Sequence, residues 1–508
     1  MSLLHIVPSA AILFGALLPL SLYSQEAIRI HPENPHYFLF RGKPIFLLSA
    51  TEHYGSVMNR PFDFIRYLND AAEHKMTLTR TFLLFREQQG SRNPSSPCKP
   101  ESPDYIAPFP RTGPGKALDG EPMYDLDQWN PEYFDRLHRF LDAASSRGII
   151  VELTLLSNTY AERVWALNPL RAENNKQHVG AIEWQEYNTL KDDELVRRQS
   201  EYARKIIRET SQYDNVYYEI CNECGGGVKG HATPEDVDAW QNEIARVIRD
   251  EMARAGRPHL IAGSQAFTYA PRVTILLNDW FSTPTFDMVN DHPLPDTQFG
   301  NRTYQMGNFM SKELMLSQVA QFCRAVYLEK KPVVLDEDNT ASIYRDPIGW
   351  TIHRKRAWTT LLNSAHYDYI DFSITVGSET GTAASRRQIR SWFQYLSELM
   401  SSFDYVHAKP DASWLNGYPG NFTASALISR NRDFIGYLAD AREVTDPQAG
   451  QPVDADVTLM LPAGDYLVSL YSPVSGQYSP AISMHGGAPF TLHLPQLEQD
   501  VLIRVTRK

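Results

Sequence analysis

One strand-like segment of the chain ends in side chains that can exchange protons. Residues 215–223 have the sequence NVYYEICNE, in which β-branched and aromatic residues lead directly to the amide of Asn222 and the carboxyl group of Glu223. Three glycines at positions 225–227 follow and allow the chain to turn. A carboxyl group at the end of such a strand indicates a site for acid–base chemistry.

A second segment has the same character. The apolar residues 332–335 lead into Asp336, Glu337 and Asp338. Glu337 lies 114 positions after Glu223, which leaves room for three strand–helix units of about 30 or more residues each. Among the three acids we favour Glu337, because of its place at the strand end.

Short β-rich runs alternate with helical stretches from residue 44 onward, a pattern that predicts parallel strands joined by crossover helices. Eight such runs are present, which is the number of strands in an α/β fold of the (β/α)8 TIM barrel type. Active sites of these barrels lie at the carboxyl ends of the strands, where both acidic segments fall. The predicted strands are 44–49, 77–82, 149–155, 216–221, 259–262, 288–290, 332–335 and 369–374.

Helices are predicted between these strands because apolar residues recur at helical spacing. Thr233, followed by a proline and two acids, predicts the start of one helix. Residues 93–120 are rich in Pro, Gly and Ser and predict a long surface loop after the second strand. The predicted helices include 131–147, 195–213, 234–255 and 311–328.

The pattern changes after about residue 401 to short alternating strands separated by turns, which predicts a small all-β sandwich. Its strands are expected at 434–438, 457–461, 466–471, 490–494 and 501–505. We therefore expect an N-terminal segment at 1–24, a barrel at 25–400 and a sandwich at 401–508.

The N-terminal segment has the features of a secretory signal peptide. An apolar stretch at 6–22 gives way to polar sequence, and cleavage is expected near Ser24. An N-terminal membrane anchor is the alternative. Because no later stretch reaches spanning length, we expect a mature protein outside the membrane, secreted or periplasmic.

Charge and motifs argue against several functions. The formal net charge is -11 and Lys and Arg form no cluster, which disfavours nucleic acid as a partner. Gly225, Gly227 and Gly230 match a dinucleotide fingerprint, but the helix cap at Thr233 comes after the last glycine, so no such cofactor is expected. Neither Gly-x-Ser-x-Gly nor His-Glu-x-x-His occurs, which argues against the common serine hydrolases and metalloproteases.

The chain has four cysteines, Cys98, Cys221, Cys224 and Cys323, too few for a disulfide framework. Export would permit one bridge without requiring any. Cys221 and Cys224 have zinc-like spacing, but no second ligand pair accompanies them. We therefore expect no metal, and we interpret these two cysteines as a small core residue and a loop thiol.

The run from the fourth strand into Asn222 and Glu223 resembles the acid/base motif of glycoside hydrolase clan A, which includes many cellulases, mannanases and β-galactosidases. The resemblance implies that Glu223 protonates the leaving glycosidic oxygen and that Asn222 binds the sugar 2-hydroxyl. It also implies that Glu337, after the seventh strand, is the nucleophile, and that Arg80 keeps it ionised.

This resemblance covers residues 27–401 approximately. One departure is Cys224, where clan members often have proline. Residues 461–466 and 471–476 resemble the C-terminal β-sandwich domains that accompany many barrel glycosidases. We expect this module to support the barrel, with glycan binding as a second option.

The implied function is hydrolysis of β-glycosidic bonds in oligo- or polysaccharides with retention of configuration. One carboxylic acid then protonates the leaving oxygen while a carboxylate about 5–5.5 Å away attacks the anomeric carbon. An inverting enzyme would instead keep the two groups about 6.5–9.5 Å apart. The alternative is a non-catalytic glycan-binding protein on the same scaffold, which would not require both acids.

Polar residues at other strand ends are candidates for sugar binding. Arg80 also has a structural interpretation, an interior ion pair with Glu219, and the two roles are compatible. Trp358 fits a core position better than a sugar platform. The other candidates are Glu52, His53, Asn158 and His292, with Trp165 and Trp350 as stacking surfaces and Glu379 in the loop after the eighth strand.

Overall fold

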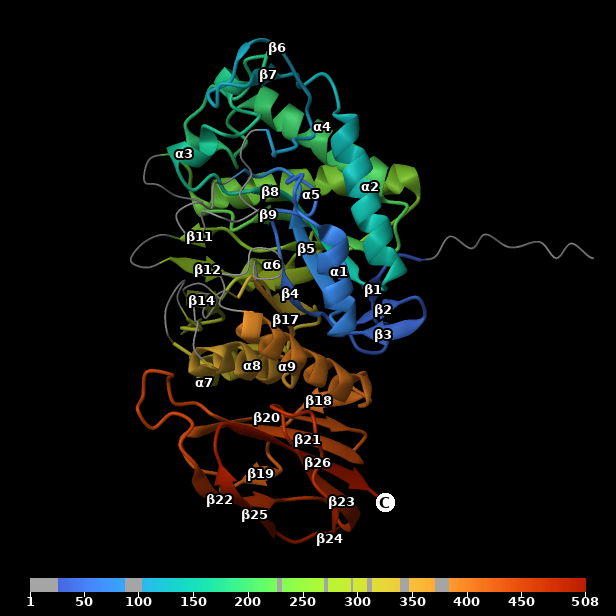
Figure 1. The fold of residues 1–508 in the computed structure, drawn as a ribbon, viewed down its shortest axis with the longest axis vertical. Helices are drawn as coiled ribbons and strands as arrows, with labels where there is room; N and C mark the ends of the chain where they lie inside the picture. Colours follow the sequence, from blue (N-terminus) through green and yellow to red (C-terminus); the bar gives the residue numbers. More distant parts are fainter. Residues whose placement is uncertain are drawn as a thin grey trace, which may run out of the picture.

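The computed structural model describes residues 26–86, 103–225, 231–268, 273–293, 296–307, 313–338, 347–370 and 383–508. The expected signal peptide, Glu379, Cys98 and two glycines of the fingerprint, Gly227 and Gly230, lie outside these ranges. Figure 1 shows a barrel surrounded by helices in the upper part of the molecule and antiparallel sheets below it.

Eight parallel strands form the barrel, as the sequence predicts. Each strand pairs in parallel with its neighbours, in the order β4-β17-β16-β13-β10-β9-β8-β5. The N–H of Thr77 donates to the carbonyl of Leu48 at 3.1 Å, which joins the two end strands and closes the ring. The strands are β4 (Leu48–Thr51), β5 (Leu78–Phe82), β8 (Ile150–Ser157), β9 (Val216–Asn222), β10 (Ile261–Gly263), β13 (Met288–Asp291), β16 (Val333–Leu335) and β17 (His366–Ile370).

Two strands begin more than two residues from their predicted positions. The expected first strand, 44–49, combines the end of β3 (Lys43–Ile45) with the start of β4, because no turn residue marks the change of direction between them. β3 belongs to a separate antiparallel sheet with β1 (Arg29–Ile30) and β2 (Phe38–Phe40). β17 begins three residues before the expected position, at His366, because its buried polar residues hide the strand pattern. Residues 371–374 of the expected strand lie outside the described part of the chain.

The small sheet β1–β3 closes the amino end of the barrel. Ile28, Phe38 and Phe40 are buried in one apolar cluster with Leu78 and Ile150 from the barrel strands. Burial of such side chains contributes on the order of 25 cal/mol per Å² of apolar surface. The opposite end of the barrel carries the polar residues.

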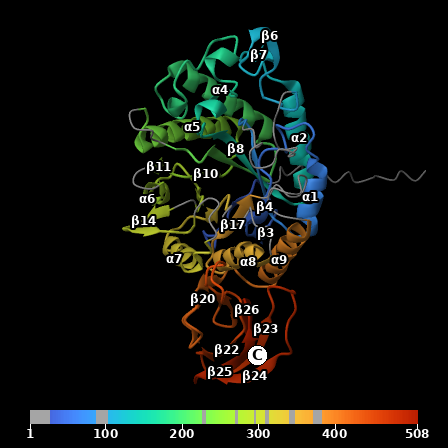
Figure 2. The ribbon, with the colours of Figure 1, turned by 60° about the vertical axis from the view of Figure 1, so that its left-hand side comes forward.

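Helices cover the outside of the barrel (Figures 1 and 2). Thr233 caps α5 through a reciprocal capping box with Asp236, and Pro234 occupies the first turn, as predicted. α7 begins at Leu316 rather than at residue 311; residues 308–312 lie outside the described part. The helices are α1 (Phe64–Glu73), α2 (Pro131–Ser146), α3 (Glu162–Trp165), α4 (Asp193–Thr210), α5 (Pro234–Ala255), α6 (Asn278–Ser282), α7 (Leu316–Val326), α8 (Pro347–Leu361) and α9 (Ala383–Ser401), with short 3-10 turns η2 (Ala172–Asn174) and η3 (Trp184–Glu186).

Two further β structures lie in the loops that follow the barrel strands. The predicted loop 93–120 contains strand β6 (Arg111–Lys116), which forms a hairpin with β7 (Pro122–Tyr124); the described part of this segment is therefore not all loop. A four-stranded sheet consists of β11 (Phe267–Thr268), β12 (Thr274–Leu276), β14 (Asp296–Phe299) and β15 (Arg302–Tyr304).

The C-terminal part is a β-sandwich of two antiparallel sheets. The first has the order β18-β20-β21-β26-β23-β24, and the second β19-β22-β25. All five predicted strands are present, but four others were not predicted: β18 (Ala408–Pro410), β19 (Leu415–Asn416), β20 (Phe422–Ser429) and β24 (Ile482–Gly486). The predicted strands correspond to β21 (Asp433–Asp440), β22 (Val453–Leu459), β23 (Gly464–Tyr471), β25 (Phe490–Leu497) and β26 (Asp500–Arg507).

Helix α8 lies between the barrel and the sandwich (Figure 1). Trp358 stacks on Tyr437 of β21 with ring centroids 5.5 Å apart, so Trp358 is a core residue, as expected. The Arg354 guanidinium forms an ion pair with Asp500 of β26 at 2.8 Å, and both side chains are buried. None of the helices in the described part of the chain combines the length and the apolar character that a bilayer span requires.

Candidate active site

The barrel brings the two predicted acids together. Glu223 follows β9 directly, and Glu337 lies two residues after β16. One carboxyl oxygen of each, together with Nδ1 of His292, forms a group of atoms that lie within 4.8 Å of one another. Residues 114 positions apart in the sequence therefore share one end of the barrel.

Both acids have unusual backbone conformations. Glu223 has φ 46° and Glu337 has φ 53°, in the left-handed region that side chains with a Cβ rarely adopt. Each such residue costs about 1–2 kcal/mol, which the surrounding contacts must offset. Strain of this kind is concentrated at functional sites.

Glu223 faces a tyrosine and a histidine. The Tyr160 hydroxyl donates to Oε2 at 2.6 Å, and Nδ1 of His292 lies 3.3 Å from Oε1. The Glu223 side chain is 15% exposed. It therefore has hydrogen-bond partners for both oxygens while remaining open to solvent.

Glu337 has a different electrostatic environment. Arg80 Nη1 donates to its Oε2 at 2.5 Å, and Nδ1 of His53 lies 3.4 Å from the same oxygen. Burial alone would raise the pKa of Glu337, but the His53 hydrogen bond and the Arg80 charge outweigh it and lower the pKa to about 2. Glu337 is thus a carboxylate at neutral pH, and its side chain is 7% exposed.

Arg80, on β5, is the central cation of the site and is fully buried. Its Nη2 donates to Glu219 Oε2 at 2.6 Å and to Asn222 Oδ1 at 2.7 Å, and its Nε lies 3.1 Å from Asp336. The contact with Glu337 and the interior ion pair with Glu219 therefore coexist, so the two interpretations of Arg80 are compatible in this geometry. A planar guanidinium has five N–H donors in a fixed fork, which suits it to several carboxylates at once.

The three consecutive acids point to different partners. Asp336 is buried beside Arg80 and 3.5 Å from His292 Nε2. Asp338 accepts a hydrogen bond at 2.5 Å from Arg356 of α8. Among the three, Glu337 is the one grouped with Glu223.

Two histidines carry positive charge into the site. Burial lowers the pKa of His53, but hydrogen bonds to Asp368 and Glu337 outweigh it and raise the pKa to about 9. Burial likewise disfavours the charged form of His292, yet Asp336 and Glu223 raise its pKa well above the usual value. Both shifts favour the protonated imidazole, and both rings face the acids.

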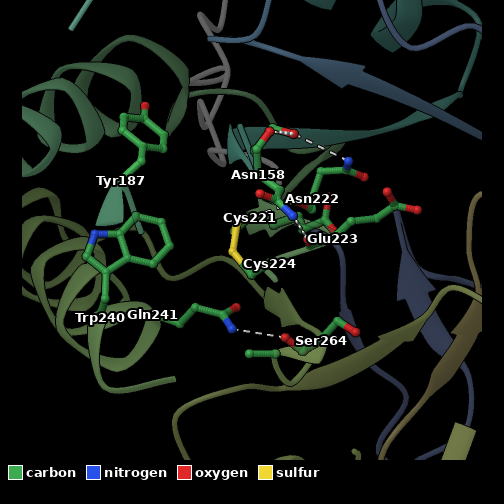
Figure 3. The surroundings of a disulfide bond; sticks show 12 residues. Asn158, Tyr187, Cys221, Asn222, Glu223, Cys224, Trp240, Gln241 and Ser264 are labelled. Carbon is green, nitrogen blue, oxygen red and sulfur yellow. Dashed lines mark hydrogen bonds between the residues drawn. A yellow bond between two sulfur atoms is a disulfide. The ribbon is translucent and has the colours of Figure 1, made fainter. Parts of the chain in front are cut away.

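Asn222 and Asn158 hold the strand end in place (Figure 3). Asn222 accepts from Arg80 and donates through Nδ2 to the Tyr160 hydroxyl at 2.7 Å. Asn158 donates through Nδ2 to the carbonyl of Glu223 at 3.1 Å, and its N–H donates to the carbonyl of Asn222 at 3.0 Å. Asn222 thus faces the site, whereas Asn158 supports the backbone beneath it.

Three sequence candidates have other surroundings. Glu52 is fully buried and accepts hydrogen bonds from the backbone N–H groups of Tyr54 and Gly55 at 2.8 and 2.7 Å, so it shapes its own loop. Trp165 is buried against Tyr187 and presents no face for stacking. Trp350 is partly buried on α8 and packs against the main core.

The interpretation of the two neighbouring cysteines was wrong. Cys221 and Cys224 form a disulfide with their Cα atoms 5.8 Å apart (Figure 3). The turn that carries Asn222 and Glu223 brings the two sulfurs together, and the spacing of the cysteines alone does not reveal that turn. Cys323 is a buried free thiol.

Tyr160 and Asp368 were missed by the sequence reasoning. Tyr160 bridges Asn222 and Glu223, and Asp368 accepts from Thr51 Oγ1 at 2.7 Å and lies 3.5 Å from His53. The one available signal for Tyr160 was its position two residues after Asn158 in the loop that follows β8. Asp368 is inside a strand, where a buried acid has no local signature.

Among the residues that the structure describes, two groups of side chains have ligand atoms close enough to hold a cation. Glu219, His292 and Asp336 form one group, but Arg80 already lies 2.6 Å from Glu219 and 3.1 Å from Asp336. Glu223, His292 and Glu337 form the other. A metal there would have to compete with the Arg80 charge on Glu337, so this donor set fits a metal poorly.

Comparison with known proteins agrees with this architecture. A family model described as "Domain of unknown function (DUF6298)" matches residues 97–220. No curated protein sequence matches the chain. A solved structure named "Glycoside hydrolase" is similar with a TM-score of 0.62 and 14% identity, covering 96% of this chain and 98% of that one.

A glycoside hydrolase family 5 structure from Bacteroides vulgatus is similar with a TM-score of 0.61 and 14% identity, covering 95% of this chain and 94% of that one. Identities this low establish the fold alone. The chain therefore has the (β/α)8 barrel and C-terminal β-sandwich found in these glycoside hydrolase structures.

Proposed function

We propose that the protein is a retaining glycoside hydrolase that cleaves β-glycosidic bonds of oligo- or polysaccharides. The observation that carries the proposal is the pair Glu223 and Glu337, whose nearest carboxyl oxygens lie within 4.8 Å at the carboxyl end of the barrel. This proximity favours the closer, retaining arrangement over the separation of about 6.5–9.5 Å that inversion uses.

The environments of the two acids support different roles. Glu337 is held ionised by Arg80 and His53, as a nucleophile must be. Within the described part of the chain, its contacts with Arg80, His53 and His292 all involve Oε2. We therefore assign the attack on the anomeric carbon to Oε1.

In the first step, Glu337 Oε1 forms a bond to the anomeric carbon while Glu223 gives its proton to the departing glycosidic oxygen. In the second step, Glu223 takes a proton from water, whose oxygen displaces Glu337 from the anomeric carbon. Tyr160 and His292 orient the Glu223 carboxyl group throughout. To Asn222, which is held by Arg80 and Tyr160, we assign binding of the 2-hydroxyl.

We further propose that the chain is exported by the signal peptide expected at residues 1–24. The Cys221–Cys224 disulfide supports this, because disulfides persist in oxidising compartments such as the periplasm and the extracellular space. The similar solved structures carry the name glycoside hydrolase, which supports a carbohydrate substrate.

The test begins with a panel of aryl β-glycosides and plant polysaccharides, with NMR identification of the first anomer released. Retention should be seen. Glu223→Gln and Glu337→Gln should each lower kcat by at least about 100-fold on an unactivated substrate, since removal of an acid–base group costs about 10²–10⁴-fold. Glu235→Gln, on the exposed first turn of α5, is the matched control and should keep full activity.

Full activity in either active-site variant would contradict the assignment. Saturable glycan binding without hydrolysis by the wild-type protein would instead support the non-catalytic alternative. Release of the inverted anomer would leave a glycosidase but refute Glu337 as nucleophile.

A further inference from the structure

The disulfide encloses the two residues on which the proposed chemistry depends. Cys221 is the penultimate residue of β9, and Cys224 lies three positions later, so Asn222 and Glu223 are the only residues between the bonded cysteines. A covalent ring this small restricts the backbone of the residues inside it. Glu223, with its left-handed φ of 46°, is one of them.

The ring is anchored on the side away from the acids. Cys221 is 0% and Cys224 is 1% exposed, and both belong to the main core together with Trp240 of α5. In Figure 3 the sulfur atoms face Trp240, while Asn222 and Glu223 extend in the other direction. The disulfide therefore ties the acidic turn to the packed layer between β9 and α5.

Hydrogen bonds hold the same turn from its two flanks. Asn158 binds the carbonyls of Asn222 and Glu223, as described above. The carbonyl of Cys224 accepts from the N–H of Phe267 at 3.1 Å, at the start of β11. These hydrogen bonds hold the carbonyl groups of the turn. The disulfide adds a covalent constraint on the backbone on both sides of Asn222 and Glu223.

We propose that the Cys221–Cys224 disulfide is a positioning element for the acid/base residue, holding Glu223 in the left-handed conformation that presents its carboxyl group to the leaving oxygen. This inference rests on the proposed function. Without the disulfide, the fold persists and the nucleophile is unaffected, but Glu223 spends less time in position. Proton transfer to the leaving group is the step that suffers.

The test uses the leaving group as a reporter of proton transfer. The dinitrophenolate of a 2,4-dinitrophenyl glycoside leaves without being protonated. The phenolate of a phenyl glycoside needs a proton from an acid in order to leave. In the Cys221→Ser/Cys224→Ser variant, kcat/KM for the phenyl glycoside should fall about 10- to 100-fold relative to that for the dinitrophenyl glycoside of the same sugar. The ratio of the two rates does not depend on how much of the preparation is folded, so it separates positioning from stability.

Cys323→Ser is the matched control, since it removes a buried thiol from α7 and should leave the ratio unchanged. If the double variant does not fold, the same ratio is measured on wild-type enzyme reduced stepwise with a phosphine, with thiols counted in each sample. The ratio should then change in step with the loss of the disulfide.

An equal loss on both substrates, or no loss, would overturn the positioning role. Detection of free Cys221 and Cys224 thiols in denatured, unreduced enzyme would overturn the premise. Failure of the proposed function has a different signature: the wild-type protein would hydrolyse neither glycoside, or Glu223→Gln would also leave the leaving-group ratio unchanged.

Discussion

At the scale of single residues, the two carboxyl groups of the site differ in the side chains that contact them. Glu337 lies against the cations Arg80 and His53, whereas Glu223 lies against a tyrosine hydroxyl and His292. The two carboxyl groups therefore have different hydrogen-bond partners a few ångströms apart. In the proposed mechanism they also have different roles, one as acid and one as nucleophile.

His53 makes stability depend on pH. Its folded pKa, about 9, is above the usual 6.5, so the protonated imidazole contributes stability that is fully present below pH 6.5 and is lost as the pH rises through 9. We expect the free energy of unfolding of the wild type, minus that of His53→Gln, to be larger at pH 6 than at pH 9.5. Urea unfolding at the two values measures it.

The control for that measurement is His493→Gln, which alters an exposed histidine of the sandwich. Its difference from wild type should be the same at both pH values to within about 0.5 kcal/mol. A pH-independent difference for His53→Gln would show that this imidazole has the same protonation in the folded and unfolded chains.

Local sequence was sufficient for the residues that end strands. Asn222, Glu223 and Glu337 follow β-branched or apolar runs, and that context places them at the mouth of a barrel. The partners Tyr160 and Asp368 and the bond between Cys221 and Cys224 depend on which loops meet after folding. Spacing along the chain does not show which loops come into contact, so the sequence alone could not predict these contacts.

At the scale of elements, strands were predictable where their apolar residues form a run. The interior of this barrel contains charged and polar side chains, and β17, with His366 and Asp368, was therefore placed too late in the chain. β20 was missed for another reason: it is buried over nearly its whole length, so it lacks the alternation that marks a half-exposed strand.

Helix α8 depends on buried ion pairs. Arg354 pairs with Asp500, which also accepts from the Tyr437 hydroxyl at 2.7 Å. Arg354→Leu and Asp500→Leu should each lower the free energy of unfolding by about 3–5 kcal/mol, because each leaves a buried charge without its partner. The double variant should lose clearly less free energy of unfolding than the sum of the two single losses. Denaturant titration of the wild type, the two single variants and the double variant gives the coupling energy.

The exposed pair Arg139 and Asp135 on α2 serves as the reference cycle. Its coupling should be below about 1 kcal/mol, as for other solvated ion pairs. Additive losses at Arg354 and Asp500 would show that their pairing contributes no more than that of the surface pair.

At the scale of the whole molecule, the sandwich packs on the barrel through a helix that belongs to the barrel. Trp358 is buried against Tyr437, and Tyr471 of β23 lies 5.9 Å from the same indole ring. Lys355 donates to the carbonyl of Asp440 at 2.9 Å. The interface thus has an apolar centre with buried cations around it.

A chain that ends at residue 401 should therefore not fold stably. Removing the sandwich would expose Trp358 and leave Arg354 and Lys355 without their partners. We expect the truncated protein to lack a cooperative thermal transition, which circular dichroism and calorimetry can establish beside the full-length chain. A sharp transition near the wild-type Tm would contradict this.

Helix α8 also carries Arg356, two positions after Arg354, and Arg356 binds Asp338 beside the proposed nucleophile and the carbonyl of Met306. One turn of α8 thus contacts the sandwich through Arg354 and the residue next to Glu337 through Arg356. Exchange of C-terminal modules between such barrels, by recombination or in a designed chimaera, would have to transfer matching α8 residues with the module. A sandwich transferred without these residues would shift α8, and with it the position of Asp338 beside the proposed nucleophile.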